Sequence, residues 1–327
     1  MNEKGLIVLE QYDLDVRNAR RGRGSFLVET DKGLKILTEC SGTEGRLVFI
    51  SRVMHHLKDR GLERLDLPVA SREGTFIVKD REDISYVLRD WYEGRECDVR
   101  SLGDIQEAVR ILALLHRDLT GIFPEKEGVP GTGTSLGEEF GRKNAELRKV
   151  RKFIRSRQRK NSFEREFLDC FEDFYGEAKL AEQEALGLSA QKLQRESREK
   201  GCLCHGDFNQ HHVLLSPEGT GVTEFGHCHY GVQMEDFGQF LRKILEKQDW
   251  DKVYGNAMIR EYGRIRPLGQ EEVENLRIRL LYPEKFWKLA NHYNSSNKAW
   301  LPQKHTEKLH LLISQQNQKA SFLKILE

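Results

Sequence analysis

The sequence predicts an α+β protein with two unlike lobes, the first rich in strands and the second larger and mostly helical. Three observations support this prediction. Short apolar runs separated by glycine-containing turns fill residues 1–90. Apolar residues then recur at helical spacing through most of the chain, with breaks at prolines. At 327 residues the chain is long enough to form two lobes with a shared cleft.

Composition excludes several classes of partner. Charged residues make up 32% of the chain, but the formal net charge is only +1, so we expect no binding to nucleic acid or to an anionic membrane. No apolar run approaches the roughly 20 residues that a membrane span needs. Residues 1–5 lack the basic start and apolar core of a secretory signal. The six cysteines lack the spacing of a zinc site, and we therefore expect reduced, mostly buried thiols in a cytoplasmic protein.

The chain is expected to begin with a strand, a glycine-containing turn, a strand, a tight turn and a third strand. The second strand is expected at Ser25–Thr30 and the third at Leu34–Thr38. Gly22 and Gly24, in the first turn, could let backbone amides approach the phosphates of a nucleotide. An ordinary hairpin turn is the alternative interpretation of these two glycines.

One main helix is expected in the first lobe, over residues 43–61, where apolar residues repeat at helical spacing before Gly61. Glu44, near its start, is placed to favour the helix dipole. The remaining strands of this lobe are expected at Leu67–Ala70, Thr75–Val78 and Tyr86–Trp91.

The second lobe is expected to begin with a helix over residues 102–119. A densely basic helix is then predicted over residues 142–165. It could bind acidic partners, phosphates or nucleic acid. Interleaved acids and apolar residues favour the alternative of a solvated helical face. Further helices are expected at Met234–Leu245, Tyr254–Tyr262, Glu271–Leu281, Phe286–His292 and Thr306–Phe322.

The stretch Cys202–Leu215, which reads CLCHGDFNQHHVLL, contains the strongest functional signal. Its polar tripeptide H-G-D, ending in Asp207, lies between two apolar runs, which predicts a rigid loop between two buried strands. A second short apolar segment, Gly221–Gly226, follows after a turn. This arrangement brings Asp207 and Glu224 near one another. One carboxylate can then accept a proton while the other holds a metal, as phosphoryl transfer requires.

These motifs resemble the aminoglycoside phosphotransferase/choline kinase-like superfamily, whose members share the two-lobed protein-kinase-like fold. The family pattern is H-G-D-x-x-x-x-N, followed by I-D-F/W. In such enzymes the first Asp orients the substrate hydroxyl, while the Asn and the second Asp hold magnesium. The resemblance therefore implies a catalytic role for Asp207. It places His212 and Glu224 at the two metal-ligand positions, with ATP and Mg²⁺ or Mn²⁺ as cofactors.

The segment W-Y-E-G-R-E-C at residues 91–97 narrows the resemblance to the spore-coat kinase-like proteins of spore-forming bacteria, the CotS group. Residues 281–288, LYPEKFWK, and residues 297–300, NKAW, fit the same group. Members resemble kinases in fold, while parts of their metal site are often altered. The resemblance implies a role in the spore coat, with coat proteins as possible partners.

The same resemblance implies a division into lobes. Residues 1–91 would form the nucleotide-binding lobe, 92–95 the hinge, and 96–327 the helical lobe with the catalytic loop. The hinge backbone near Trp91 and Glu93 would then face an adenine edge. From the residues alone, Arg95 and Glu96 suggest an ion pair that fixes the angle between the lobes.

Three positions depart from the family pattern. Thr38 stands where a lysine is expected to bind the nucleotide phosphates, and strand alternation turns Lys35 to the opposite face. Lys35 is therefore expected to be a solvated edge residue, unless a bulge turns it to the cleft. His212 offers nitrogen, a poor ligand for magnesium but acceptable to manganese or zinc. Glu224 carries one more methylene group than the expected Asp. The histidines around this loop suggest a transition-metal site, but adjacent histidines rarely bind one ion.

Three functions therefore compete. The first is an ATP-dependent phosphotransferase that acts on a small hydroxyl or amino acceptor, with Asp207 as the base. The second is a catalytically inactive pseudokinase that serves as a binding or scaffold protein in spore coat assembly. The third is a binding module that uses the basic helix. The altered electrostatic groups favour weakened or lost catalysis, because phosphoryl transfer depends on positioning and charge neutralisation.

Overall fold

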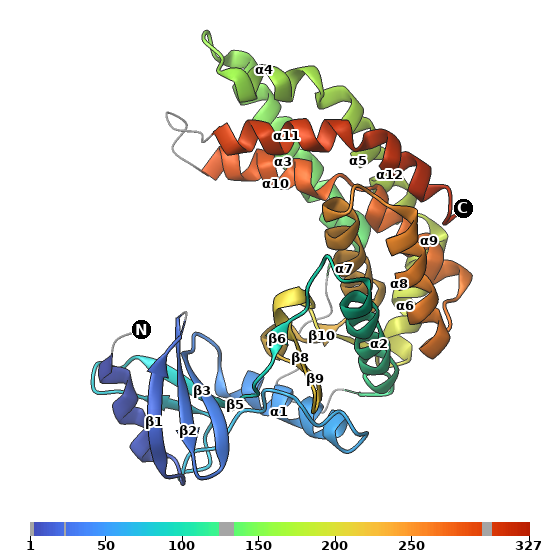
Figure 1. Ribbon diagram of the computed structural model, residues 1–327. Helices are drawn as coiled ribbons and strands as arrows, with labels where there is room; N and C mark the ends of the chain where they lie inside the picture. Colours follow the sequence, from blue (N-terminus) through green and yellow to red (C-terminus); the bar gives the residue numbers. More distant parts are fainter. Residues whose placement is uncertain (1–2, 23, 124–133, 296–302) are drawn as a thin grey trace. The chain divides into compact units, whose positions relative to one another are not determined.

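The computed structural model describes residues 3–22, 24–123, 134–295 and 303–327 (Figure 1). The chain divides into two compact units. The first comprises Met1–Thr132 with Lys200–Tyr230, and the second Gly133–Glu199 with Gly231–Glu327. The strand-rich beginning and the H-G-D loop therefore belong to one unit. The predicted hinge at residues 92–95 lies inside this unit, and the predicted lobe boundary stays a prediction.

A five-stranded antiparallel sheet dominates the beginning of the first unit. Its strands, in spatial order, are β1 Val16–Arg21, β2 Ser25–Thr30, β3 Gly33–Glu39, β5 Ser85–Asp90 and β4 Ile77–Lys79. The strand predicted at residues 67–70 is wrong. Pro68 forms only an isolated bridge with Arg89, flanked by hydrogen bonds from the Val69 amide to the Leu88 carbonyl oxygen and from the Asp90 amide to the Leu67 carbonyl oxygen.

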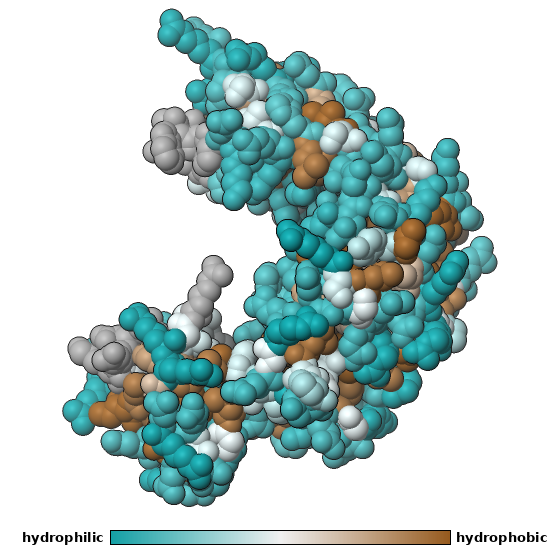
Figure 2. Space-filling view, in the orientation of Figure 1, coloured by the Kyte–Doolittle hydropathy of each residue, from teal (hydrophilic) through white to brown (hydrophobic). Residues whose placement is uncertain are grey.

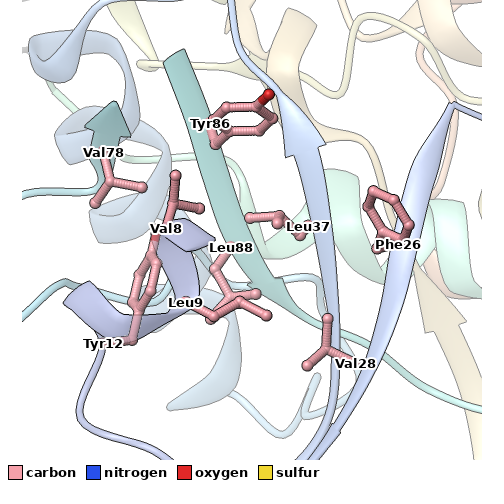
Figure 3. Close-up of a cluster of buried hydrophobic side chains, with 9 residues drawn as sticks. All are labelled: Val8, Leu9, Tyr12, Phe26, Val28, Leu37, Val78, Tyr86 and Leu88. Atoms are coloured by element: carbon pink, nitrogen blue, oxygen red, sulfur yellow. The ribbon is translucent and has the colours of Figure 1, made fainter. Parts of the chain in front are cut away.

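One face of this sheet is covered by η1 (Glu3–Gln11), a 3-10 helix at the start of the chain. The core between them contains Val8, Leu9, Tyr12, Phe26, Val28, Leu37, Val78, Tyr86 and Leu88 (Figure 3). Strand alternation therefore places Leu37 and Leu88 on the face that packs against η1. Thr38 and Arg89, the next residue in each strand, lie on the opposite face.

The main helix of this region is α1 (Glu44–Lys58), which confirms the helix expected there. Thr43 caps its first turn by accepting a hydrogen bond from the Arg46 amide. Glu44 lies in the first turn, as expected, but its carboxylate accepts the amides of Phe76 and Ile77 at 2.7 and 2.9 Å. Glu44 thus anchors the start of α1 to the segment that enters β4.

The rest of the first unit supports the H-G-D loop. Two small sheets form, one from β7 and β10 and the other from β6, β8 and β9. The Glu107 carboxylate of α2 accepts a hydrogen bond from the Thr220 hydroxyl of β9. The elements are β6 Arg95–Glu96, α2 Leu102–Asp118, β7 Leu203–Cys204, η2 Gln210–His212, β8 Val213–Ser216, β9 Gly219–Val222, η3 Phe225–His227 and β10 His229–Tyr230.

The second unit is helical throughout its described residues. Its helices are α3 Leu136–Ser156, α4 Ser162–Asp169, α5 Phe171–Ala185, α6 Leu188–Glu199, α7 Met234–Lys247, α8 Lys252–Ile265, α9 Gln270–Leu281, α10 Glu284–Ser295, α11 Gln303–Ser314 and α12 Gln316–Leu323. The tyrosine of the LYPEKFWK segment, Tyr282, stacks on Phe140 at 4.1 Å between ring centroids, and Phe286 stacks on Phe167 and Phe174. This segment therefore contributes aromatic side chains to the core of the second unit. The NKAW segment at residues 297–300 lies outside the described residues.

The single basic helix predicted over residues 142–165 is wrong. Arg157 is extended, and Asn161 caps a new helix, α4, through a capping box with Glu164. Acids also neutralise part of its charge, since Lys143 pairs with Glu139 and Glu284. These pairs favour the interpretation of a solvated, locally balanced face.

The visible surface is largely hydrophilic, with apolar side chains in small scattered groups (Figure 2). Among the described residues, no helix combines the length and the apolar character that a bilayer span requires.

Candidate active site

The backbone of Asp207 is held by His205, a fully buried side chain. The Asp207 amide donates to His205 Nδ1 at 3.2 Å, and His205 Nε2 lies 3.0 Å from the Thr223 carbonyl oxygen. Nδ1 accepts a proton and Nε2 must donate one, so these contacts assign the neutral Nε2–H tautomer. One histidine thereby ties the loop to the end of β9.

Gly206 explains the middle letter of the H-G-D tripeptide. Its φ angle is +86°, a left-handed conformation that side chains disfavour. A Cβ atom there would also lie 2.2 Å from the His227 carbonyl oxygen. Both constraints require glycine, and the tight approach turns the chain sharply just before Asp207.

Asn209 organises the turn that follows Asp207. Its Oδ1 accepts the His211 amide at 3.0 Å, and its Nδ2 donates to Asp207 Oδ1 at 3.2 Å. Nδ2 also lies 2.9 Å from His212 Nδ1, which in turn lies 2.8 Å from the Asp207 carbonyl oxygen. The Asp207 side chain is 37% exposed, so its carboxylate is positioned and still reachable.

The β8–β9 hairpin brings Glu224 to the same place. The Thr223 amide donates to the His212 carbonyl oxygen at 3.0 Å, next to the contact between His205 and Thr223. Asp207, His212 and Glu224 are therefore attached to one hydrogen-bonded framework. Glu224 itself has φ +69° and ψ +49°, a left-handed conformation that is uncommon for a non-glycine residue.

Asp66 supports Glu224 from a segment distant in sequence. Its Oδ2 accepts the Glu224 amide at 3.0 Å, while its Oδ1 is buried without a hydrogen-bond partner among the described residues. Burial raises the pKa of Asp66 to about 7, against the opposing effect of the nearby Arg89 guanidinium. The backbone beside Asp66 bridges β9, at Leu65 and Val222.

The donors of this framework fit a metal only in part. Glu224 is a partly exposed residue whose carboxylate has no side-chain partner among the described residues. The His212 ring uses Nδ1 locally, which leaves Nε2 for a ligand. Within the described residues, no group of three or more His, Cys, Asp and Glu side chains could hold a metal ion. A metal at these two residues would therefore complete its coordination with water and phosphate oxygens, as Mg²⁺ usually does.

The sheet face opposite the η1 core contains the position where the family has its lysine. Arg89 Nη1 donates to Thr38 Oγ1 at 2.9 Å. Lys35 lies on the other face, as the alternation predicted, and its ammonium binds Asp90 at 2.7 Å and the Lys32 carbonyl oxygen at 2.6 Å. The expectation of a solvated Lys35 was wrong, because this residue is 7% exposed and closes a cross-strand ion pair.

A hydrogen bond joins the end of β1 to the start of β2. The Gly22 amide donates to the Ser25 carbonyl oxygen at 2.8 Å, and Gly24 has φ +73°. Gly24 therefore has a conformational role in the hairpin, while Gly22 contributes its backbone amide. Their role in nucleotide binding stays a prediction.

The segment after β5 uses some of the backbone groups assigned to an adenine edge. The Trp91 amide donates to the Leu34 carbonyl oxygen at 3.0 Å, and the Glu93 carbonyl oxygen accepts from Arg64 at 3.0 Å. The Tyr92 hydroxyl donates to the Leu65 carbonyl oxygen at 2.9 Å. Contact of Trp91 and Glu93 with a nucleotide stays a prediction, and it would need backbone groups other than these two.

Arg95 and Glu96 do not pair with each other, so the predicted ion pair is wrong. The Arg95 guanidinium forms a two-bond contact with Asp104 of α2, and Glu96 binds His211. Neighbours in a strand point to opposite faces, which separates the two side chains. Both contacts still fix the segment against the loop and α2.

Sequence reasoning missed Asn209, Asp66 and Arg89. Asn209 could have been found from its chemistry, because Asn favours turns and caps short helices through its own side chain. Asp66 and Arg89 carry no local signal. Their contacts are to residues 158 and 51 positions away, and only the folded chain brings them together.

The fold and this site define a kinase-like protein of the aminoglycoside phosphotransferase fold. An aminoglycoside phosphotransferase from Alicyclobacillus acidocaldarius subsp. acidocaldarius DSM 446 superposes with a TM-score of 0.86 at 16% identity, over 97% of this chain and 93% of that one. A spectinomycin phosphotransferase, solved with ADP and spectinomycin, superposes with a TM-score of 0.63 at 13% identity, over 94% and 92% of the two chains.

The family match is more specific than the likeness in fold. Residues 6–326 match the model of the spore coat putative kinase YutH family, and the chain belongs to that family. It is also similar to spore coat protein S of Bacillus subtilis (strain 168), with 23% identity over 310 residues, covering 94% of this chain and 88% of the relative.

Proposed function

We propose that this protein is an ATP-dependent phosphotransferase that acts on a hydroxyl or amino group of a small molecule. One observation supports this most directly. The Asp207 carboxylate is partly exposed, and its backbone and side chain are fixed by His205 and Asn209 on the framework that also holds Glu224. A positioned carboxylate beside a second acid is the arrangement that phosphoryl transfer uses.

In the proposed reaction, the acceptor's oxygen or nitrogen forms a bond to the γ-phosphorus of ATP. The bond from that phosphorus to the bridging oxygen breaks, and ADP leaves. The acceptor's proton passes to Asp207, which the loop positions for this task. A divalent metal, when bound, neutralises charge on the phosphates, and Glu224 and the His212 Nε2 atom are the groups in this chain that would hold it.

Two further parts of the proposal, nucleotide binding and a location in the spore coat, are supported by the comparisons in general terms. The spectinomycin phosphotransferase of the same fold was solved with ADP. The family description and the relative from Bacillus subtilis both refer to the spore coat. We therefore propose that the protein associates with the spore coat, with coat proteins as partners.

A thermal-shift titration with ATP and either Mg²⁺ or Mn²⁺ tests this proposal, followed by an assay for ADP release in the presence of small alcohols and amines. We expect stabilisation by nucleotide with Mn²⁺ at least as effective as Mg²⁺, because His212 offers nitrogen. ADP release should need Asp207. The absence of any shift with both metals would exclude the enzyme.

A catalytically inactive pseudokinase is the second candidate. The observation that favours it is the set of altered positions, Thr38, His212 and Glu224, where the family pattern has Lys, Asn and Asp. Nucleotide binding without turnover, unchanged in Asp207→Asn, would favour a scaffold role. Release of ADP from ATP that is lost in Asp207→Asn would exclude the pseudokinase.

A further inference from the structure

The position expected to hold the phosphate-binding lysine holds a hydroxyl that is already in contact with a cation. Thr38 Oγ1 accepts a hydrogen bond of 2.9 Å from Arg89 Nη1. In the register of β3 and β5, Thr38 pairs with Val87 and Ile36 pairs with Arg89. Thr38 and Arg89 are thus diagonal neighbours on the same face of the sheet, which is the distance that a long side chain spans.

The Arg89 guanidinium keeps donors for an additional partner. A guanidinium has five N–H donors, and the bond to Thr38 uses one of them. Among the described residues, Arg89 makes no other side-chain hydrogen bond and no ion pair within 4.0 Å, and the side chain is only partly buried. Lys35 differs from Arg89. It lies on the other face of the sheet, and its ammonium already binds Asp90 and the Lys32 carbonyl oxygen.

Arg89 is also electrostatically coupled to the segment that carries Glu224. Its positive charge acts on Asp66, whose Oδ2 accepts the Glu224 amide. Asp66 is 2% exposed and its Oδ1 has no hydrogen-bond partner among the described residues. A cation that acts on a buried acid offsets part of the cost of burying its charge.

We infer that Arg89 replaces the strand lysine as the cation that binds the phosphates of a nucleotide, with the Thr38 hydroxyl holding its guanidinium in place. A planar guanidinium suits this task because it offers two parallel donors to phosphate oxygens. The phosphate-binding positive charge is then supplied by Arg89 of β5 instead of by a lysine at position 38 of β3. This inference rests on the proposed binding of a nucleotide.

Calorimetric titration of the full chain with ATP, ADP and adenosine tests the assignment. In Arg89→Met we expect the affinity for ATP to fall by about 10- to 100-fold, the loss for one set of charge-assisted hydrogen bonds. The affinity for adenosine should stay within about threefold of the unaltered protein, because adenosine has no phosphate. Arg81→Met, at an exposed arginine of the turn before β5, is the matched control and should change neither affinity.

A charge-swap variant keeps the test decisive even if Arg89→Met is less stable. Thr38→Lys combined with Arg89→Met places an ammonium where the family has it, and should restore most of the lost ATP affinity. An ATP affinity unchanged in Arg89→Met, or lost only in Lys35→Met, would overturn the inference. Equal losses for ATP and adenosine without rescue by the swap would show a structural role instead. Failure of the unaltered protein to bind any nucleotide would overturn the proposed function as well.

Discussion

The loop around Asp207 and the sheet face around Thr38 are built in opposite ways. In the loop, Asp207 contacts His205, Asn209 and His212, all within five residues of it. On the sheet face, Thr38 contacts Arg89 51 positions away, and Asp66 contacts Glu224 158 positions away. Local contacts keep a recognisable sequence pattern, whereas distant contacts can exchange residue types if the partner changes too.

This difference separates the base of the proposed reaction from its charge-neutralising groups. The loop has the complete H-G-D tripeptide. Its glycine, Gly206, is required because the backbone is left-handed there and leaves no room for a side chain. The departures fall among the electrostatic groups: Thr38 in β3, Glu224 after β9, and His212 at the end of the loop. A substitution there can be offset by another cation on the same face, which is the role assigned to Arg89.

Asp207→Asn should produce the largest effect, because it removes the base without disturbing the loop. We expect the rate of ADP release to fall by about 10²- to 10⁴-fold. The Asn side chain still accepts the bond from Asn209, so stability should change by less than about 1 kcal/mol. Single-turnover kinetics and urea denaturation measure the two quantities. Asp59→Asn, at the exposed end of α1, is a control that should leave both unchanged.

His205→Ala should break the framework between the loop and β9. His205 is fully buried, and its removal leaves the Asp207 amide and the Thr223 carbonyl without their partner and opens a cavity against Phe225. We expect a loss of about 2–4 kcal/mol in the free energy of unfolding, measured by urea denaturation. His227→Ala, on the exposed η3 turn, should change it by about 0.5 kcal/mol or less. Equal stability of the two variants would contradict the framework.

Glu44→Gln tests the contact between the start of α1 and the segment that enters β4. The Gln side chain can accept only one of the two amides that Glu44 accepts, and its NH₂ group then faces the other. We expect a destabilisation of about 1–3 kcal/mol, measured by thermal or urea denaturation. Glu73→Gln, at an exposed acid in the preceding turn, is the control. No difference between these variants would show that the contact contributes nothing.

Asp104 of α2 binds Arg95 of β6. Its substitution should have the smallest effect of the four changes. The Arg95 guanidinium lowers the pKa of Asp104 from 3.8 to about 2. A depressed pKa stabilises the folded protein above the unfolded value, so this contribution is present above pH 4 and lost as pH falls towards 2.

Asp104→Asn should therefore lower stability at pH 7 by about 1–2 kcal/mol, a figure reduced for the exposure of Arg95. The gap between the unaltered protein and the variant should close on acidification, as followed by urea denaturation at several pH values. A gap that stays constant between pH 5 and pH 2 would contradict the ion pair. Arg95→Met should show the same pH dependence.

Several elements could be predicted because their signals are local. The second and third strands, helix α1, helix α2 and the loop between β7 and β8 all follow from hydrophobic spacing and turn residues. The strand predicted at residues 67–70 failed because the segment meets β5 through a single bridge and two backbone hydrogen bonds, too few for a strand. The 3-10 helix η1 was missed, although its apolar residues fill the core beneath the sheet.

The sequence by itself determined the H-G-D loop and the hairpin that presents Glu224, because each depends on a period or on a residue with one permitted conformation. The kinase-like fold followed from the resemblance of these motifs to a known superfamily. Only the tertiary structure decided which cation lies beside Thr38, where Asp66 is buried and which acid receives Arg95. Alternation gives the face on which a side chain lies, but strand pairing chooses its neighbours, and pairing is a property of the whole sheet.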